Sequence, residues 1–181
     1  QTKFSETLAK QTDTKQLANK LESLAVLEQM ASDNPDMRAV VKAQGNLAID
    51  SMLLQDDVQK TARKEAFASK VDSNEILNRL TAGDSEALLA DLKNKDGGVH
   101  TEYTGLSPDD RRKYIEQAQK GASEQEGLRL AETDWAKDGP KNDMDIIDIE
   151  QAVERVSVKA KTEEGRKAAV TALREKNTIH N

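Results

Sequence analysis

The stretch GLSPDDRRKYIEQAQKGASEQEGLRLAETDWAKDG, residues 105–139, decides the fold expected of this chain. Its start has the features of a helix N-terminus. The side chain of Ser107 can accept a hydrogen bond from the backbone amide of Asp110, and Pro108 in the first helical position gives up no useful donor. A helix is therefore expected to begin at this point.

The end of the same stretch is equally well marked. Gly139 can adopt the left-handed conformation that stops a helix, and Pro140 prevents its continuation. The sequence thus predicts a long central helix over residues 107–138, about 45 Å long at 1.5 Å per residue. Gly121 and Gly127 lie inside it and each costs roughly 1 kcal/mol relative to alanine. They mark either close helix contacts or a break, and the sequence leaves both alternatives open.

Composition supports helices throughout the 181 residues. Hydrophobic residues make up 36% and aromatic residues 3%, whereas 33% are charged and three are proline. A compact globular domain is usually richer in apolar residues, so narrow apolar seams between long helices are favoured. We expect an all-α fold, an elongated helical bundle with long antiparallel helices, two short helices and no substantial sheet.

The N-terminal part, residues 1–71, is predicted to form a long helical hairpin. A first helix covers about residues 5–31. Asn34 is a good N-cap and Pro35 a good first residue for a second helix, whose apolar track continues to about Ala62 or Phe67. Two long helices joined by a short polar turn form an antiparallel hairpin most simply.

Residues 72–181 are predicted to form a helical bundle that contains the central 107–138 helix. The sequence Asp72-Ser73-Asn74-Glu75 resembles a capping box that starts a short helix. This helix stops at Gly83, and Asp84 caps a second short helix. Residues 94–105, which contain two glycines, are interpreted as a loop, with weak extended pairing around Val99 and Tyr103 as the alternative.

Two more helices are expected after Pro140. The apolar spacing from Ile146 to Ala160 indicates a strongly amphipathic helix. Thr162 then begins a last helix, and residues 177–181 are expected to fray.

Composition also excludes several classes of protein. Without cysteine the chain has neither disulfides nor thiolate metal sites. No apolar run approaches the about 20 residues of a membrane span, so no membrane span is expected within this segment. The formal net charge is −6 with basic residues dispersed among acids, and direct nucleic-acid binding is therefore not expected. Since the first residue is Gln, we expect a fragment of a larger protein.

No pattern of catalytic, cofactor-binding or metal-ligating residues emerges. His100 and His180 are far apart in sequence and have no His or Cys at helical ligand spacing. Adjacent acids fall at predicted helix starts, where the helix dipole favours them. Asp143, Asp145 and Asp148 are spaced as in a calcium loop, but the required glycine and terminal glutamate are missing. We expect no enzyme activity from this chain, and neither a cofactor nor a bound metal.

Four residues of the central helix are candidates for contact with a protein partner. Arg111 and Arg112 belong to a basic cluster that is interpreted first as a solvated helix face and second as a partner or anion contact. Trp135 is interpreted first as a packing anchor and second as an exposed binding residue. The fourth candidate is Tyr114, the other aromatic residue of this helix.

The order of features between about residues 60 and 176 is similar to that in a known group of proteins. Phe67-Ala68 precedes a short helix with Leu80 and Gly83-Asp84, a leucine-rich helix, the segment Leu106–Tyr114, a long Gln-rich and Ala-rich helix, and Trp135 before Gly139-Pro140. This order resembles segments of internal virion or DNA-ejection proteins of tailed bacteriophages and of related prophage tail proteins. In those proteins a similar helix start follows a Leu…Gly-Asp turn.

The resemblance implies a structural or assembly segment of a virion protein that is made in the bacterial cytoplasm and is ejected with the genome. Some members of the group carry a peptidoglycan-cleaving domain, but its catalytic Glu-Ser pair and Gly-rich segment have no match in this chain. The implied partners are other virion proteins or further copies of the chain, and a homo-oligomer is expected because the apolar stripes contain few aromatic residues. The alternative is a non-phage helical interaction module, such as an adaptor, effector or chaperone-like bundle.

Overall fold

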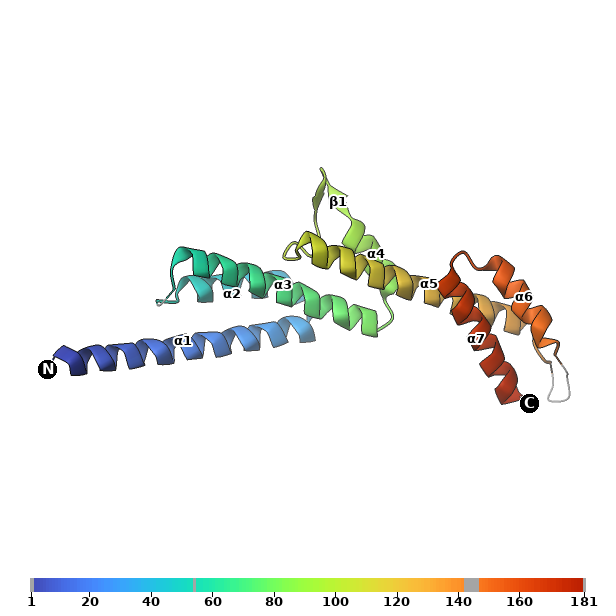
Figure 1. Cartoon of the computed structure of the whole chain (residues 1–181), viewed down its shortest axis with the longest axis horizontal. Helices are drawn as coiled ribbons and strands as arrows, with labels where there is room; N and C mark the ends of the chain where they lie inside the picture. The colour runs from blue at the N-terminus through green and yellow to red at the C-terminus, as the bar shows by residue number, and fades with distance from the viewer. Residues whose placement is uncertain (1, 54, 142–146, 181) are drawn as a thin grey trace. The chain divides into compact units, whose positions relative to one another are not determined.

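The computed structural model describes residues 2–53, 55–141 and 147–180, with side chains from residue 11 onward. Within these ranges the chain forms seven α-helices, one 3-10 helix and one two-stranded hairpin (Figure 1), which confirms the all-α class. The elements in order are α1 (Thr2–Asp33), η1 (Pro35–Met37), α2 (Arg38–Asp50), α3 (Asp57–Thr81), α4 (Ser85–Lys93), β1 (Lys95–Asp96), β2 (Val99–His100), α5 (Pro108–Asp138), α6 (Ile149–Lys159) and α7 (Glu163–His180).

The chain divides into two compact units. The first unit consists of Gln1–Arg79 and Leu92–Arg112, and the second of Leu80–Asp91 and Lys113–Asn181. The division expected between residues 71 and 72 falls in the middle of α3, which is a continuous helix. Each unit has its own hydrophobic core and its own buried carboxylate, and each is described separately below.

The first unit is built on the hairpin of α1 and α2. As predicted, Asn34 caps the turn: its side chain accepts a hydrogen bond from the amide of Asp36, and Pro35 opens η1. Helices α1, α2 and α3 then enclose one core of seven buried residues, Leu24, Ala31, Val41, Ile49, Met52, Phe67 and Val71. Gly45 is essential to this packing because a β-carbon there would overlap the ring of Phe67.

The predicted second helix is in fact two helices. Helix α2 ends at Asp50 and α3 begins at Asp57, so the prediction of one helix to residue 62 or beyond is wrong. The carboxylate of Asp56 accepts a hydrogen bond from the Gln59 amide at 2.8 Å, and the Gln59 side chain accepts one from the Asp56 amide at 3.4 Å. This reciprocal capping starts a new helix where the apolar spacing alone predicted continuation.

The predicted helix start at Asp72 is also wrong. Helix α3 passes through this position without interruption, and the side chains of Asp72 and Glu75 are buried within it. A capping box requires an exposed first turn whose amides are free. Here those amides bond within the helix, and the carboxylate of Asp72 is used by residues from other elements.

Residues 94–105 contain more structure than the loop that was predicted. β1 and β2 pair antiparallel, with Lys95 opposite His100 and Asp96 opposite Val99. Gly97 and Gly98 have φ angles of 55° and 88°, the left-handed conformation that a tight two-residue hairpin turn requires. Extended pairing at Val99 was the alternative considered, whereas Tyr103 lies outside the strands.

Helix α5 is continuous through both of its internal glycines. The Asp110 amide donates to Ser107 Oγ at 3.1 Å and the helix begins at Pro108, as predicted. Gly121 and Gly127 mark close contacts: a β-carbon on Gly121 would overlap the Ser85 side chain. The structure therefore decides between the two alternatives that the sequence left open.

The end of α5 differs from the prediction. Among the described glycines only Gly83, Gly97 and Gly98 have a positive φ, so Gly139 does not adopt the left-handed conformation. Its amide instead continues the helical hydrogen-bonding pattern by donating to the carbonyl of Trp135 at 2.9 Å. The helix stops because Pro140 has no amide to continue that pattern.

The second unit packs α5, α6 and α7 around a core of small residues. This core consists of Ala131, Ala152, Val156, Ala169 and Leu173. Asp148 caps α6 by accepting from the Gln151 amide, and Thr162 Oγ1 accepts from the Gly165 amide at the start of α7. Helix α7 continues to His180, so residues 177–180 are helical where fraying was expected, and Asn181 lies outside the described residues. Ile146, Asp143 and Asp145 lie outside the described residues.

We predict that Gly127→Ala destabilises the second unit although alanine is the better helix former. A β-carbon at this position would overlap the backbone carbonyl of Gly165, which cannot rotate away. The expected loss is about 1–3 kcal/mol in the free energy of unfolding, measured by urea titration of Trp135 fluorescence. Gly121→Ala is the graded control, because it meets a serine side chain instead of backbone and should lose less. Equal stability of Gly127→Ala and the unmodified chain would contradict the close approach.

Candidate functional site

Asp72 is the centre of the polar interactions in the first unit. Its side chain is fully buried, and the Lys42 ammonium lies 2.6 Å from Oδ1. Arg38 Nε is 3.7 Å from the same oxygen, and the backbone amide of Gly105 donates to Oδ2 at 2.8 Å. One carboxylate therefore connects α2, α3 and the loop before α5. A buried charge is tolerated only when it is paired in this way.

Tyr103 anchors the loop before α5 to helix α3. It is 2% exposed and has a φ of 53°, an uncommon conformation for a bulky residue. Arg79 Nη1 donates to its hydroxyl at 2.8 Å, and the Arg38 guanidinium lies 4.4 Å from its ring centroid. Burial lowers the pKa of Arg38, but hydrogen bonding to Tyr103 and the charge of Asp72 outweigh it, so the pKa is raised overall.

Arg111 is a further cation at this centre, which corrects its interpretation as part of a solvated face. It is 5% exposed and donates to the carbonyls of Leu92 (3.0 Å), Glu102 (2.7 Å) and Tyr103 (2.5 Å). Burial lowers the pKa of Arg111, and the negative charge of Asp72 opposes this shift. A planar guanidinium with five donors suits three carbonyls better than any other side chain.

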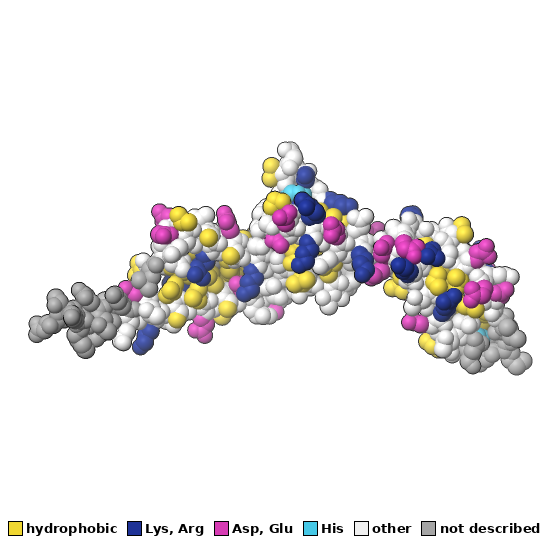
Figure 2. All heavy atoms as spheres, viewed as in Figure 1, with side chains coloured by type: hydrophobic (Ala, Val, Ile, Leu, Met, Phe, Trp, Pro, Cys, Tyr) yellow, Lys and Arg dark blue, Asp and Glu magenta, His cyan; other side chains and the backbone are white. Residues whose placement is uncertain are grey.

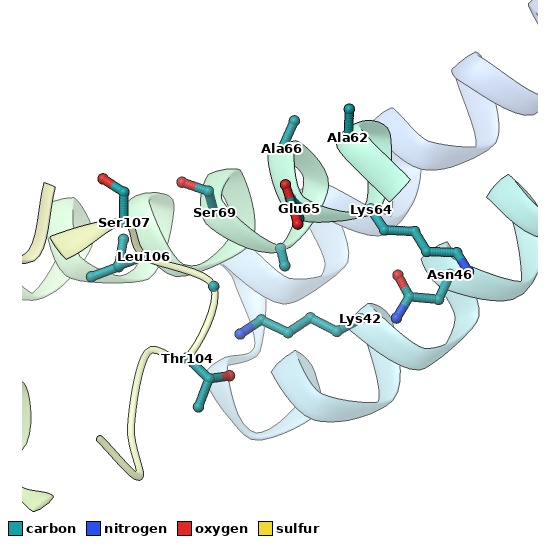
Figure 3. Close-up of a pocket in the computed structure, with 12 residues that line it drawn as sticks. Lys42, Asn46, Ala62, Lys64, Glu65, Ala66, Ser69, Thr104, Leu106 and Ser107 are labelled. Carbon is teal, nitrogen blue, oxygen red and sulfur yellow. The ribbon is translucent and has the colours of Figure 1, made fainter. Parts of the chain in front are cut away.

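A groove of about 710 Å³ lies beside this centre (Figure 3). Its walls come from α2, α3 and the loop 104–107, and the view shows Lys42 extending from α2 toward the loop at Thr104. Gly105 allows the loop to approach α3 closely, because a β-carbon there would lie 2.6 Å from the Ala68 carbonyl carbon. The charge network thus fixes the position of one wall of the groove.

Polar groups that line the groove are engaged by other groups of the fold. The amines of Lys42 and Lys64 are paired with Asp72 and Asp50, each at 2.6 Å. Ser107 Oγ donates to the Asp110 carboxylate at 2.7 Å and accepts a hydrogen bond from the Asp110 backbone amide, so this hydroxyl is used as a helix cap. Within the described parts of the chain, no three His, Asp or Glu side chains are grouped to hold a metal.

The second unit has a separate ion pair between α5 and α6. Arg155 Nη2 and Nε donate to the two carboxylate oxygens of Asp134 at 2.7 and 3.0 Å. The Asp134 side chain is 2% exposed, and Lys159 approaches it at 3.9 Å. The hydrogen bonds from Arg155 hold the pKa of Asp134 below its usual value, although burial acts in the opposite direction.

The four candidate partner residues do not form one site. Arg111 and Arg112 belong to the first unit, where Arg111 is buried and Arg112 is exposed. Tyr114 and Trp135 belong to the second unit and are half-buried. They are 21 positions apart on one helix, about 30 Å at 1.5 Å per residue. Trp135 packs against the core of that unit and meets the His180 ring edge-on, which agrees with its first interpretation as a packing anchor.

Sequence reasoning missed the residues on which the groove depends. Asp72 was assigned to a helix cap, and neither Arg38 nor Tyr103 was singled out for a role at a polar centre. The partners of Asp72 lie 30 to 34 positions away at Lys42, Arg38 and Gly105. No local pattern reports contacts over such separations, and a positive φ at tyrosine has no sequence signal.

No family model matches the chain, and no curated protein or solved structure matches it either. None of the described helices is both long enough and apolar enough to cross a membrane. The class of protein that the structure defines is an all-α protein with two compact units, and anything more specific about its function is a proposal.

We predict that Asp72→Asn destabilises the first unit by roughly 3–5 kcal/mol, because it leaves the half-buried Lys42 ammonium without its carboxylate partner and Arg38 with only its ion pair to Glu102. The free energy of unfolding is measured by urea titration of the helical circular dichroism signal. Asp96→Asn is the matched control, since Asp96 is exposed in the hairpin. Equal stability of the two variants would show that the network contributes nothing to folding.

We predict that the Asp134–Arg155 pair makes the second unit sensitive to acid. A carboxyl with a lowered pKa in the folded state stabilises it above the unfolded pKa of 3.8, and this contribution is lost as the pH falls through the lower folded pKa. Asp134→Asn should cost about 1–3 kcal/mol at pH 7. The difference from the unmodified chain, measured by Trp135 fluorescence in urea, should shrink below pH 3.8. A difference that is constant with pH would rule out the ionic contribution.

Proposed function

We propose that this chain is a structural and assembly segment of a phage or prophage virion protein, of the internal virion or DNA-ejection type. It acts through helix packing and protein–protein contacts, with other virion proteins or further copies of itself as partners. Its place is the virion, after synthesis in the bacterial cytoplasm. The order of motifs between residues 60 and 176 supports the family, and the surface of the helices supports the mode of action.

The observation that carries the proposal is the set of large apolar side chains that remain exposed. Val26 and Leu47 in the first unit are 57% and 70% exposed, and Leu128 and Val158 in the second are 47% and 81% exposed. Figure 2 shows hydrophobic side chains on the surface of both units, interspersed with charges of both signs. In the proposal these side chains belong to contiguous apolar patches with polar rims, the kind of surface that marks protein–protein contact sites. By contrast, the buried side chains of Asp72, Arg111 and Asp134 are engaged in holding the fold.

The proposal is tested by the complete reading frame and by the particle. The gene should lie in a head or tail cluster, and mass spectrometry of purified phage or induced prophage particles should detect its peptides. A gene outside any such cluster whose product is absent from particles would overturn the proposal. Specific capture of a host protein, lost on changing Tyr114 or Trp135 to alanine, would instead favour an adaptor, effector or chaperone-like module.

A further inference from the structure

The hairpin of the first unit carries an aspartate followed by glycine at its turn. β1 ends at Asp96, and Gly97 and Gly98 form the two-residue turn that leads into β2. All residues from 94 to 99 are exposed. A β-carbon added at either glycine would meet no atom of the described chain within 4 Å, so the turn is surrounded by open space.

The hydrogen bonds of the hairpin leave the Gly97 amide out. Asp96 is opposite Val99, and in a two-residue turn the ladder bonds join these two flanking residues. The peptide group between Asp96 and Gly97 is therefore not held through its amide. Strands of two residues also make only a marginal hairpin, which opens locally at low cost.

An Asp-Gly pair in this setting can rearrange its own backbone. The Gly97 amide nitrogen attacks Cγ of Asp96, and a C–N bond forms as the carboxyl oxygen leaves as water with the amide proton and the carboxyl proton. Glycine favours this ring closure because it has no β-carbon to crowd the turning peptide group. Water then opens the five-membered succinimide. Attack at the Cγ carbonyl restores aspartate, whereas attack at the backbone carbonyl leaves the chain joined through Cγ, as isoaspartate.

The sequence contains a second Asp-Gly pair, Asp138-Gly139, in the opposite setting. Asp138 is the last residue of α5, and the Gly139 amide donates to the Trp135 carbonyl at 2.9 Å. The Asp138 carboxylate lies 3.9 Å from Arg155 Nε, and a β-carbon on Gly139 would overlap the Trp135 carbonyl. Rotation of this peptide group must first break the helix end.

We propose that Asp96-Gly97 is a site of spontaneous isomerisation to isoaspartate, and that Asp138-Gly139 is protected from the same reaction by its helix. The two pairs share their residue types and an exposed carboxylate, and they differ in whether the glycine amide is held. The reaction consumes and releases one water and needs no other reactant. It is independent of the proposed function, because it uses only the chain and the solvent.

The product changes the hairpin and leaves the core alone. Isoaspartate carries the main chain through its β-carbon, so one methylene is added between Asp96 and Gly97. The pairing of Lys95 with His100 and of Asp96 with Val99 has no place for this extra atom at a two-residue turn. The hairpin pairing is therefore lost, whereas the core of the first unit contains none of these residues.

The proposal is tested by ageing the 181-residue chain in warm neutral buffer. Isoaspartate has the same mass as aspartate, so it is measured in digested samples by chromatographic separation with electron-based fragmentation, and by labelling with an isoaspartate-specific methyltransferase. It should accumulate at residue 96 at least about tenfold faster than at residue 138, since the helix end must open first. A sample digested before ageing corrects for isomerisation during digestion. Equal rates at the two pairs, or none at residue 96, would overturn the proposal.

Two variants test the chemistry of the ring. Asp96→Glu keeps an exposed carboxylate but would need a six-membered ring, so the methyltransferase label should fall to the level of the unaged chain. Asp96→Asn forms the same five-membered ring with ammonia as the leaving group, and it should convert faster with a measurable gain in mass. Undiminished labelling of Asp96→Glu, or an Asp96→Asn chain that keeps its mass, would contradict succinimide formation at this turn.

The role of the structure is tested by unfolding. In concentrated urea neither glycine amide is held, so the two Asp-Gly pairs should isomerise at similar rates. A difference between residues 96 and 138 that persists unchanged in urea would show that the neighbouring residues set the rates, and it would overturn protection by the helix.

Discussion

The first unit depends on the burial of the Asp72 carboxylate. Asp72 lies on a continuous helix with no access to solvent, and its charge must be compensated there. Compensation comes from Lys42, Arg38 and the amide of Gly105, which lie on α2 and on the loop before α5. The requirement to neutralise this charge therefore determines where two other segments sit. Two further contacts hold the same loop in place. The Tyr103 hydroxyl accepts a hydrogen bond from Arg79, and Arg111 donates to the Tyr103 carbonyl.

The helices of the second unit are held together by close packing of small residues and by one ion pair. The core of this unit consists of three alanines with Val156 and Leu173, and α5 and α7 approach so closely that Gly127 has no room for a β-carbon next to Gly165. Asp134 and Arg155 then join α5 to α6 in a bidentate pair at the edge of this core. Small residues supply close packing, and the ion pair supplies geometric specificity that small apolar residues lack.

These constraints bear on the function in one respect. The buried side chains of Asp72, Arg111 and Asp134 are engaged in holding helices and a loop, and the groove beside Asp72 is lined by amines that are already paired. The surface, in contrast, carries large apolar side chains such as Val26, Leu47 and Val158. Buried polar groups that hold the fold and large apolar side chains that remain exposed fit a protein that works through contacts with other chains, which is why an assembly role is proposed.

The sequence by itself determined the helical class, because apolar spacing and capping residues act within one or two turns. Asn34 and Ser107 cap where the sequence predicted, and Thr162 starts the helix expected there; Asp148 caps in the same local way, and each of the four needs a partner only two or three positions away. Only the tertiary structure decided that α3 runs through Asp72, that Arg111 is buried, and that Gly121 and Gly127 are contact points within one helix. These outcomes depend on groups distant in the chain, and the free energy of pairing a buried charge or closing a helix contact exceeds the local preferences that the sequence displays.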